Sequence, residues 1–306
     1  MTPYYQAIKE KLAKKEVVIL DGAIGTEILR RNVSWADHQV INYPLVIRSI
    51  HEDYIKAGAD MITTNTFQLA RRSFLNHFKD LEHMRHIGAR GLEQRAEELL
   101  RAAVNLTLEA RQQVGARRKV AIAGSITTLE WCFRPDLSPT AHQAKQEYIE
   151  IGRAFKESGA DLILLETVNN VSEAVAAMQA FHEVEIPGWI SFVCDSAGNL
   201  FSGETLDQAV TALEPLKPDA ILLNCAPPTD ISAGVKKLAP RNKAATGAYA
   251  HIGRFDPPEW YFTDEYPPQT YLDVCRQWVD MGATVVGGCC GTTPEHIALL
   301  SKSLRN

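Results

Sequence analysis

The chain has 306 residues, of which 45% are hydrophobic, which is enough for one large α/β barrel or two modest domains. The net charge is −5, from 32 basic and 37 acidic residues, and no basic tract runs along the chain, so nucleic-acid binding is not expected. No stretch approaches the length of a membrane span, so we expect a cytoplasmic protein whose six cysteines are reduced rather than paired in disulfides.

Short apolar runs alternate with longer helical patterns along the chain. Residues 1–15 lack the apolar core of a signal peptide and predict a short amphipathic helix. Strands are predicted at 17–20, 61–64, 120–123, 162–165, 189–193, 220–223, 243–248 and 284–286. Helices are predicted at 43–57, 81–114, 141–158, 172–184, 205–213, 230–238, 268–281 and 294–304. Eight βα units predict a (β/α)8 (TIM) barrel, with residues 1–306 forming one domain.

Polar residues follow the predicted strands, and in such a barrel the active site lies at the carboxyl ends of the strands. We expect these residues to face one mouth and to bind substrate or metal: Asp21, Gly22, Asn65, Thr66, Ser125, Glu166, Asn224, Cys225, His251, Cys289 and Cys290. Glu166 follows four apolar residues and is placed to receive a substrate ammonium, with a salt bridge to a nearby loop as the alternative. Asp21 before Gly22 is also a common turn pair, although the glycine lets backbone N–H groups approach a carboxylate.

Cys289 and Cys290 are adjacent, lie between glycines and end an apolar strand pattern. Neighbouring side chains of a regular strand point to opposite faces, so both thiols converge only if the backbone leaves strand geometry, which glycine permits. With Cys225 as the third ligand, they indicate a soft metal, most often zinc, with an exchangeable fourth position. Such a zinc lowers the pKa of an entering thiol and favours alkyl transfer over hydrolysis. The alternative is that some of these thiols are plain buried side chains, as we expect for Cys132, Cys194 and Cys275.

Several motifs together resemble the homocysteine S-methyltransferase family over essentially the whole chain. The motifs are, in order, Asp21-Gly22-Ala23-Ile24-Gly25-Thr26-Glu27, Thr63-Thr64-Asn65-Thr66-Phe67, Leu165-Glu166-Thr167, Asn224-Cys225 and Gly287-Gly288-Cys289-Cys290-Gly291-Thr292-Thr293-Pro294. The resemblance implies Zn²⁺ held by Cys225, Cys289 and Cys290, with homocysteine bound to it through sulfur. It also implies that Glu166 and the Asp21-Gly22 turn hold the amino-acid end, and that the thiolate attacks a methyl group to give methionine.

Two places depart from the family's pattern. Where the family usually reads Gly-Ser-Ile-Gly-Pro after the third strand, this chain has Thr127 and Thr128 in place of the Gly-Pro bend, and their role stays open. After the seventh strand, His251 aligns with an asparagine that in some relatives occupies zinc's fourth position when substrate is absent. We hypothesise that His251 is a fourth ligand or a nearby acid or base; the alternative is a histidine that only hydrogen-bonds a neighbour.

The expected activity is zinc-dependent methyl transfer to homocysteine from a small donor, such as S-methylmethionine, S-adenosylmethionine or betaine. A chain of this length leaves no room for folate or cobalamin domains, although a corrinoid partner protein is an alternative methyl source. Two other functions stay open: a methyltransferase or demethylase acting on another methylated sulfur or nitrogen compound, and a non-catalytic zinc-bound homocysteine-binding subunit. The aromatic, proline-rich segment 253–268 predicts either a lid or a surface excursion, and no motif indicates the oligomeric state.

Overall fold

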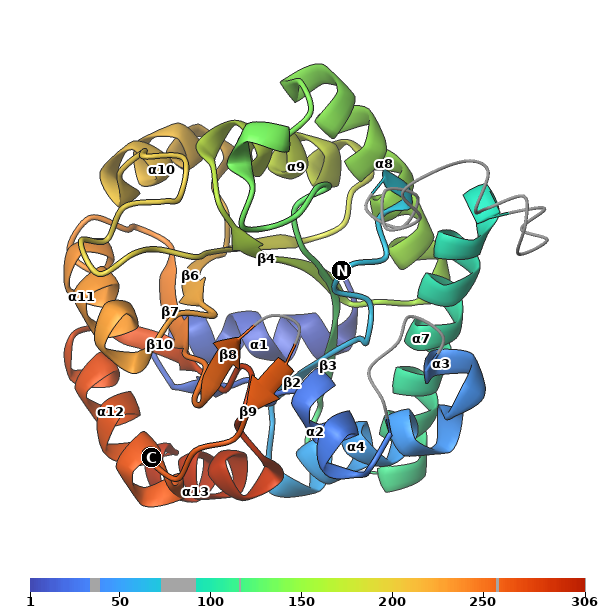
Figure 1. Cartoon of the computed structure of the whole chain (residues 1–306), viewed down its shortest axis with the longest axis vertical. Helices are drawn as coiled ribbons and strands as arrows, with labels where there is room; N and C mark the ends of the chain where they lie inside the picture. Colours follow the sequence, from blue (N-terminus) through green and yellow to red (C-terminus); the bar gives the residue numbers. More distant parts are fainter. Residues whose placement is uncertain (34–38, 73–91, 116, 257–258, 306) are drawn as a thin grey trace.

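A ring of eight parallel strands forms the centre of the protein (Figure 1). The computed structural model describes residues 1–33, 39–72, 92–115, 117–256 and 259–305. The ring strands are β1 (Val18–Ile19), β2 (Met61–Thr63), β3 (Ala121–Ile126), β4 (Leu162–Val168), β5 (Gly188–Phe192), β6 (Ala220–Asn224), β7 (Ala245–Tyr249) and β10 (Ala283–Val286). They pair in the order β1-β10-β7-β6-β5-β4-β3-β2, and a bridge between Leu20 and Met61 closes the ring. The fold is the predicted (β/α)8 barrel.

Helices cover the outside of the ring (Figure 1). They are α4 (Pro44–Ala57), α7 (Leu92–Val114), α8 (Ala141–Ser158), α9 (Val171–Glu183), α10 (Leu206–Leu213), α11 (Pro228–Leu238), α12 (Pro268–Asp280) and α13 (Pro294–Leu304). Each matches a predicted helix, although 81–91 of the second predicted helix lie outside the described residues. The sequence did not predict α2 (Gly25–Arg30), α3 (Gln39–Asn42), or the 3₁₀ turns η1 (Pro135–Leu137) and η2 (Glu214–Leu216). Within the described ranges, no helix is both long and apolar enough to span a bilayer.

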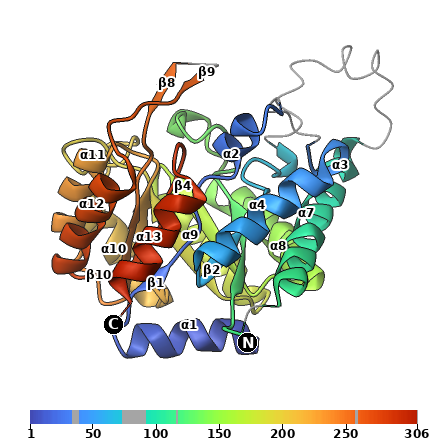
Figure 2. The same cartoon turned by 90° about the horizontal axis from the view of Figure 1, so that it is seen from below.

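The predicted amino-terminal helix, α1 (Pro3–Ala13), closes one end of the barrel. Figure 2 shows it lying across the end at which both termini are found. Tyr5 of this helix is buried in the same apolar cluster as the inward-facing strand residues. Its hydroxyl donates to Asp219 at 2.6 Å and accepts from the indole N–H of Trp189 at 2.9 Å. The amino ends of the strands are therefore sealed by packed, hydrogen-bonded side chains, and the carboxyl ends lie away from this helix.

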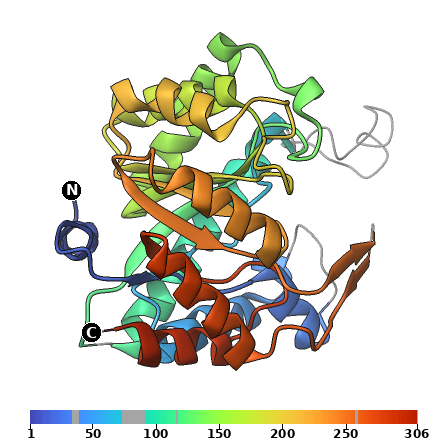
Figure 3. The same ribbon diagram turned by 90° about the vertical axis from the view of Figure 1, so that its left-hand side faces the viewer.

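An antiparallel hairpin rises from the other end of the barrel. It consists of β8 (Arg254–Asp256) and β9 (Glu259–Tyr261), and Figures 2 and 3 show it projecting from the end opposite α1. The sequence predicted only an irregular aromatic segment here, because the two strands are three residues long. The Arg30 guanidinium of α2 lies 4.0 Å from the centre of the Phe262 ring just beyond β9. The hairpin is thus attached to the rim of the predicted mouth.

Candidate active site

A layer of polar side chains lies inside the barrel at the carboxyl ends of the strands. Alternate residues of a strand face the same side, so this layer continues the inward-facing apolar positions below it. Ser125 on β3, Glu166 on β4, Ser191 on β5, Asn224 on β6 and Tyr249 on β7 are all buried. Ser191 was not predicted, because a serine in a strand carries no local signal.

Three thiols converge beside this layer, as predicted. The sulfur atoms of Cys225, Cys289 and Cys290 all lie within 4.8 Å of one another. Within the described ranges, this is the one group of three or more potential metal ligands, and it includes neither a histidine nor a carboxylate. Cys225 has a φ of 56°, a left-handed conformation that is uncommon for a residue other than glycine. This turn ends β6 and lets the Cys225 thiol face the other two.

The backbone of the double-cysteine loop is fixed by bonds to the segment after β7. Cys289 N–H donates to the Ala250 carbonyl at 3.0 Å, and Ile252 N–H donates to the Cys290 carbonyl at 2.8 Å. Gly291 follows with a φ of 90°, and a Cβ atom there would lie 1.8 Å from the Ile252 carbonyl oxygen. Glycine is therefore required at this position for the two cysteines to leave strand geometry together.

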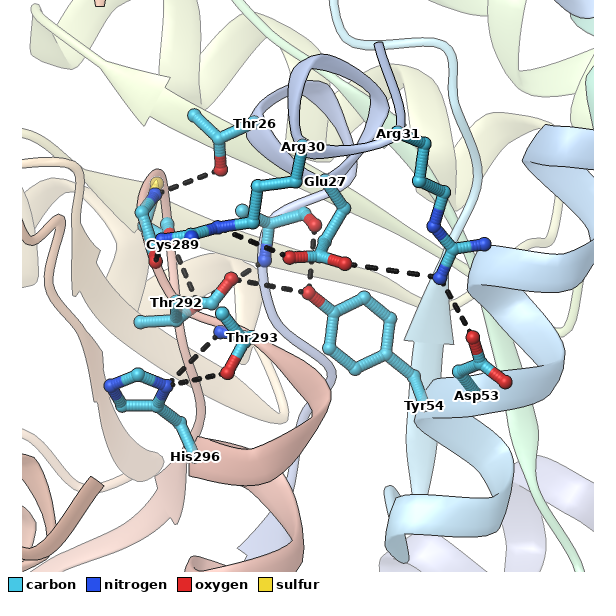
Figure 4. A network of polar contacts seen from close by, with 12 residues as sticks. Thr26, Glu27, Arg30, Arg31, Asp53, Tyr54, Cys289, Thr292, Thr293 and His296 are labelled. Carbon is cyan, nitrogen blue, oxygen red and sulfur yellow. Dashed lines mark hydrogen bonds and ion pairs between the residues drawn. The ribbon is translucent and has the colours of Figure 1, made fainter. Parts of the chain in front are cut away.

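Thr292 joins the double-cysteine loop to the loop after β1 (Figure 4). Its hydroxyl donates to the Cys289 carbonyl at 2.7 Å and accepts from Ala23 N–H at 3.2 Å. Tyr54 of α4 donates to the Ala23 carbonyl at 2.7 Å, and a Cβ atom on Gly22 would lie 2.8 Å from the Thr292 hydroxyl. The Asp21-Gly22 turn and the thiols are consequently held in one fixed arrangement.

The three thiols influence one another's protonation. Hydrogen bonds with Cys289 and Cys290, together with burial, raise the pKa of Cys225 well above its usual range. Hydrogen bonds from Cys225 and Cys289 lower the pKa of Cys290 well below its usual range. Of the three thiols, Cys290 is therefore the one that most readily carries negative charge, and Cys225 keeps its proton until a metal displaces it. Three soft donors at this spacing fit a thiophilic metal, which displaces the remaining protons on binding.

Glu166 presents a buried carboxylate at the centre of the polar layer. The Ser125 hydroxyl donates to one carboxylate oxygen, and the Tyr249 hydroxyl donates to the other at 3.0 Å. Burial, and then the nearby Cys289 sulfur, raise the pKa of Glu166 to about 7. The charged form of Glu166 is thus only partly compensated by the protein, which is the condition in which a carboxylate gains most from a cationic ligand.

Asp21 provides a second buried carboxylate. It accepts hydrogen bonds from Thr63 N–H at 2.7 Å and from the Thr63 hydroxyl at 3.0 Å. Burial raises the pKa of Asp21 to about 7 against these two hydrogen bonds, and the charge of Glu166 adds to the rise. The negative charges of these two buried carboxylates repel each other. Binding of a positively charged ammonium group beside them is therefore strongly favourable.

A bulge places Glu166. The pairing of β4 with β5 shifts register between Leu165 and Val168, and Thr167 within the bulge has a φ of 57°. The Asn224 side-chain oxygen accepts from Thr167 N–H at 2.9 Å, and its NH₂ group donates to the Thr167 hydroxyl at 2.9 Å. Ser191 donates to the same Asn224 oxygen at 2.7 Å. The side chain of Asn224 is therefore bonded within the protein, where it supports the bulge.

The other predicted site residues have different surroundings. The Thr66 hydroxyl is paired with the Thr64 hydroxyl at 2.6 Å and donates to the Ser125 carbonyl, so it links β2 to β3. Asn65 lies in the turn after β2 and is half-buried. The His251 ring lies edge-on to Trp260, with 5.9 Å between ring centres, and is close enough to Cys289 for the two side chains to interact electrostatically. The structure thus brings together the thiols, both carboxylates and Ser125, with His251 at the edge.

Comparisons with known proteins agree with this arrangement. Selenocysteine Se-methyltransferase of Brassica oleracea var. italica is 28% identical, over 94% of this chain and 88% of its own. Homocysteine S-methyltransferase 1 of Arabidopsis thaliana is 27% identical, over 98% of this chain and 97% of its own. The metallated form of the Escherichia coli homocysteine methyltransferase MmuM has the same fold, with a TM-score of 0.79 and 24% identity over 98% of this chain and 99% of that one. The family profile described as Homocysteine S-methyltransferase matches residues 18–304, so the chain belongs to the homocysteine S-methyltransferase family.

Proposed function

We propose that the protein transfers a methyl group from a small donor to the thiol of homocysteine and so forms methionine. The observation that carries the proposal is the convergence of three thiols beside two buried carboxylates in one barrel mouth. Thiols suit a soft metal that accepts a substrate sulfur, and paired carboxylates suit the ammonium of an amino acid. The names of the relatives, among them the Arabidopsis homocysteine S-methyltransferase, support the same acceptor.

Cys225, Cys289 and Cys290 would hold the metal, which we propose is Zn²⁺. When bound, Zn²⁺ supplies a soft Lewis acid that lowers the pKa of a substrate thiol. The protein keeps the three ligands in place through the left-handed turn at Cys225 and the bonds of the double-cysteine loop. Six free cysteines, three of them gathered in this site, suit a reducing compartment such as the cytoplasm.

Glu166 and Asp21 would bind the homocysteine ammonium. Ser125 and Tyr249 orient the Glu166 carboxylate, so the cation would meet a fixed partner rather than a mobile side chain. At the Asp21-Gly22 turn, the Gly22 N–H would receive the substrate carboxylate, because the Asp21 N–H already donates to the Met61 carbonyl at 3.0 Å. Asn224 and Thr66, whose polar atoms are bonded to protein groups, would position the site rather than touch substrate.

The donor would carry a positively charged methyl-bearing group, such as a sulfonium or a quaternary ammonium. With the three cysteines bound to the metal as thiolates and the two carboxylates ionised, the site would carry a net negative charge that attracts a cation. In the transfer, a bond forms between the acceptor sulfur and the methyl carbon as the bond from that carbon to the donor atom breaks. The acceptor thiol gives up its proton to solvent and reacts as a thiolate. The electron pair of the broken bond stays on the donor atom, which becomes neutral, so the reaction needs no oxidant or reductant.

A donor panel tests this proposal. Zinc-loaded protein would be incubated with isotopically labelled homocysteine and S-methylmethionine, S-adenosylmethionine or betaine. Labelled methionine and the unlabelled demethylated donor, which is also methionine when S-methylmethionine is the donor, would then be quantified separately by mass spectrometry. We expect equimolar formation of both products with at least one cationic donor. Stoichiometric binding of homocysteine with no turnover on any donor, alone or with a methylated corrinoid protein, would instead support the non-catalytic binding subunit.

His251 lies near the three thiols. Among the described residues, it does not belong to the group of potential metal ligands that these thiols form. Its ring packs edge-on against Trp260 of the hairpin. These contacts favour a role at the rim over a role as fourth ligand. Zinc content and the absorption spectrum of the Co²⁺-substituted protein decide between the two, because loss of a ligand changes both and loss of a rim residue changes neither.

A further inference from the structure

The main chains that follow β7 and β10 stay paired beyond the ends of these two strands. Gly287 N–H donates to the Ala248 carbonyl at 3.3 Å. Cys289 N–H donates to the Ala250 carbonyl at 3.0 Å. These bonds are two rungs of one parallel ladder, and the rung between them would join Ala250 N–H to the Gly287 carbonyl. The pairing of the strands therefore reaches the first of the two adjacent cysteines.

A tyrosine hydroxyl from α12 takes the place of that middle rung. Ala250 N–H donates to the Tyr271 hydroxyl at 3.1 Å. The hydroxyl donates in turn to the Gly287 carbonyl at 2.8 Å, which is nearer than the Ala250 carbonyl at 3.3 Å. Tyr271 is fully buried, and its ring packs edge-on against Trp278 and His296. The ring is thus fixed on the outside of the barrel, and its oxygen atom is inserted between the two strands.

The ladder changes register immediately after this insertion. A regular continuation would join Ile252 N–H to the Cys289 carbonyl, but Ile252 N–H donates to the Cys290 carbonyl at 2.8 Å. Cys289 and Cys290 together therefore oppose the single residue His251, which is the two-against-one pairing of a β-bulge. A bulge re-aims a side chain, and this one accounts for two adjacent thiols that both converge on Cys225.

We propose that Tyr271 is a positioning residue for the metal centre, because its hydroxyl opens the ladder and lets the cysteine bulge form beside it. Without the hydroxyl, Ala250 N–H and the Gly287 carbonyl would be left buried and unpaired unless the strands closed to join them directly. Closure would pull on Cys289, which makes the next rung, and would move its sulfur relative to the other two. This inference rests on the proposed metal centre and adds a residue that touches neither metal nor substrate.

The test compares Tyr271→Phe with Tyr148→Phe. Phenylalanine keeps the ring and its packing against Trp278 and His296, so Tyr271→Phe should fold. Tyr148 of α8 is equally buried, and its hydroxyl donates to Glu173 of α9 at 2.7 Å, which makes it a matched control. Zinc affinity would be measured by competition with a chromophoric chelator. We expect Tyr271→Phe to raise the Kd for zinc tenfold or more, as loss of a group that holds metal ligands in place does. Tyr148→Phe should lower Tm and keep the wild-type Kd for zinc.

Two further measurements separate the position of the ligands from a general loss of stability. The absorption bands of the Co²⁺-substituted protein report the geometry of the thiolates, and they should change in Tyr271→Phe but not in Tyr148→Phe. A crystal structure of Tyr271→Phe should show Ala250 N–H bonded directly to the Gly287 carbonyl.

Three results would overturn the inference. The first is a Kd for zinc in Tyr271→Phe that rises less than tenfold, and the second is an equal rise in Tyr148→Phe. The third is a Tyr271→Phe structure in which the main chain and the three sulfur atoms keep their wild-type places. A wild-type protein that binds no zinc would instead overturn the proposed metal centre itself, which the same titration records first.

Discussion

Replacing Glu166 by glutamine removes one charge from the site and almost nothing else. Glutamine has the shape of glutamate, so the Tyr249 hydroxyl keeps an oxygen acceptor and the Ser125 hydroxyl can accept from the new NH₂ group. What the variant loses is the anion that we propose pairs with the homocysteine ammonium. The substitution therefore tests the assignment of the amino-acid end of the substrate.

The magnitude follows from the burial of Glu166, which is 9% exposed. Removing one partner of a buried charge pair costs about 3 kcal/mol or more, which corresponds to a roughly 150-fold loss of affinity for homocysteine. The fold should not suffer, because burial raises the pKa of Glu166 from 4.5 to about 7 and so penalises its charged form. This penalty lowers the free energy of unfolding by at most about 3 kcal/mol. It is absent below pH 4.5 and reaches its full size above pH 7. Glu166→Gln should accordingly match the wild type in acid and be at least as stable at pH 8.

The assay is calorimetric titration of the zinc-loaded proteins with homocysteine and with 4-mercaptobutyrate, the same thiol without its ammonium. Wild type should prefer homocysteine strongly, and Glu166→Gln should lose most of this preference, keeping only the part that Asp21 contributes. The double comparison isolates the pairing of carboxylate with ammonium from general damage to the site. A variant with full zinc content whose homocysteine Kd changes less than threefold would refute the reasoning, because the ammonium would then lie elsewhere.

Three further outcomes are expected. Cys290→Ala should reduce zinc, measured by plasma mass spectrometry, from one to well below 0.5 per chain, whereas His251→Ala should keep one; the opposite pattern would make His251 a ligand. Asn224→Leu leaves the buried Thr167 N–H and Ser191 hydroxyl unpaired and should cost about 3 kcal/mol in urea unfolding; a cost below 1 kcal/mol would mean that the bulge supports itself. Burial lowers the pKa of His51 to about 4, so the folded state keeps this histidine neutral where the unfolded state protonates it. Acidification from pH 6.5 to 4 should therefore remove up to about 3 kcal/mol from the free energy of unfolding of the wild type. His51→Leu should lack this part of the loss, and an equal loss in the variant would contradict the assignment.

The sequence predicted the features of the site that depend on order along the chain. The eight strands were visible as apolar runs, and the positions of Cys225, Glu166 and Asp21 after those runs predicted that they share one mouth. The bulge at Glu166 was not predictable, because the left-handed conformation of Thr167 is supported by Asn224, which lies 57 residues away. The contact of Tyr249 with Glu166 spans 83 residues and depends on strand order rather than on any local pattern.

The double-cysteine motif is so recognisable in sequence because its glycines have close neighbours, either at the end of β1, in the segment after β7 or within the motif itself. A Cβ atom on Gly287 would lie 2.5 Å from Leu20 Cβ, and one on Gly288 would lie 2.1 Å from the Thr292 hydroxyl. The loops after β1, β7 and β10 thus pack as one body around the thiols, and a change in any of them would move a ligand. The loop after β3 is anchored by separate contacts to α8 and α9, away from the double-cysteine motif. Substitutions at positions 127 and 128 are therefore not expected to move the thiols, whereas a change at His251 lies in a segment that contacts the double-cysteine loop directly.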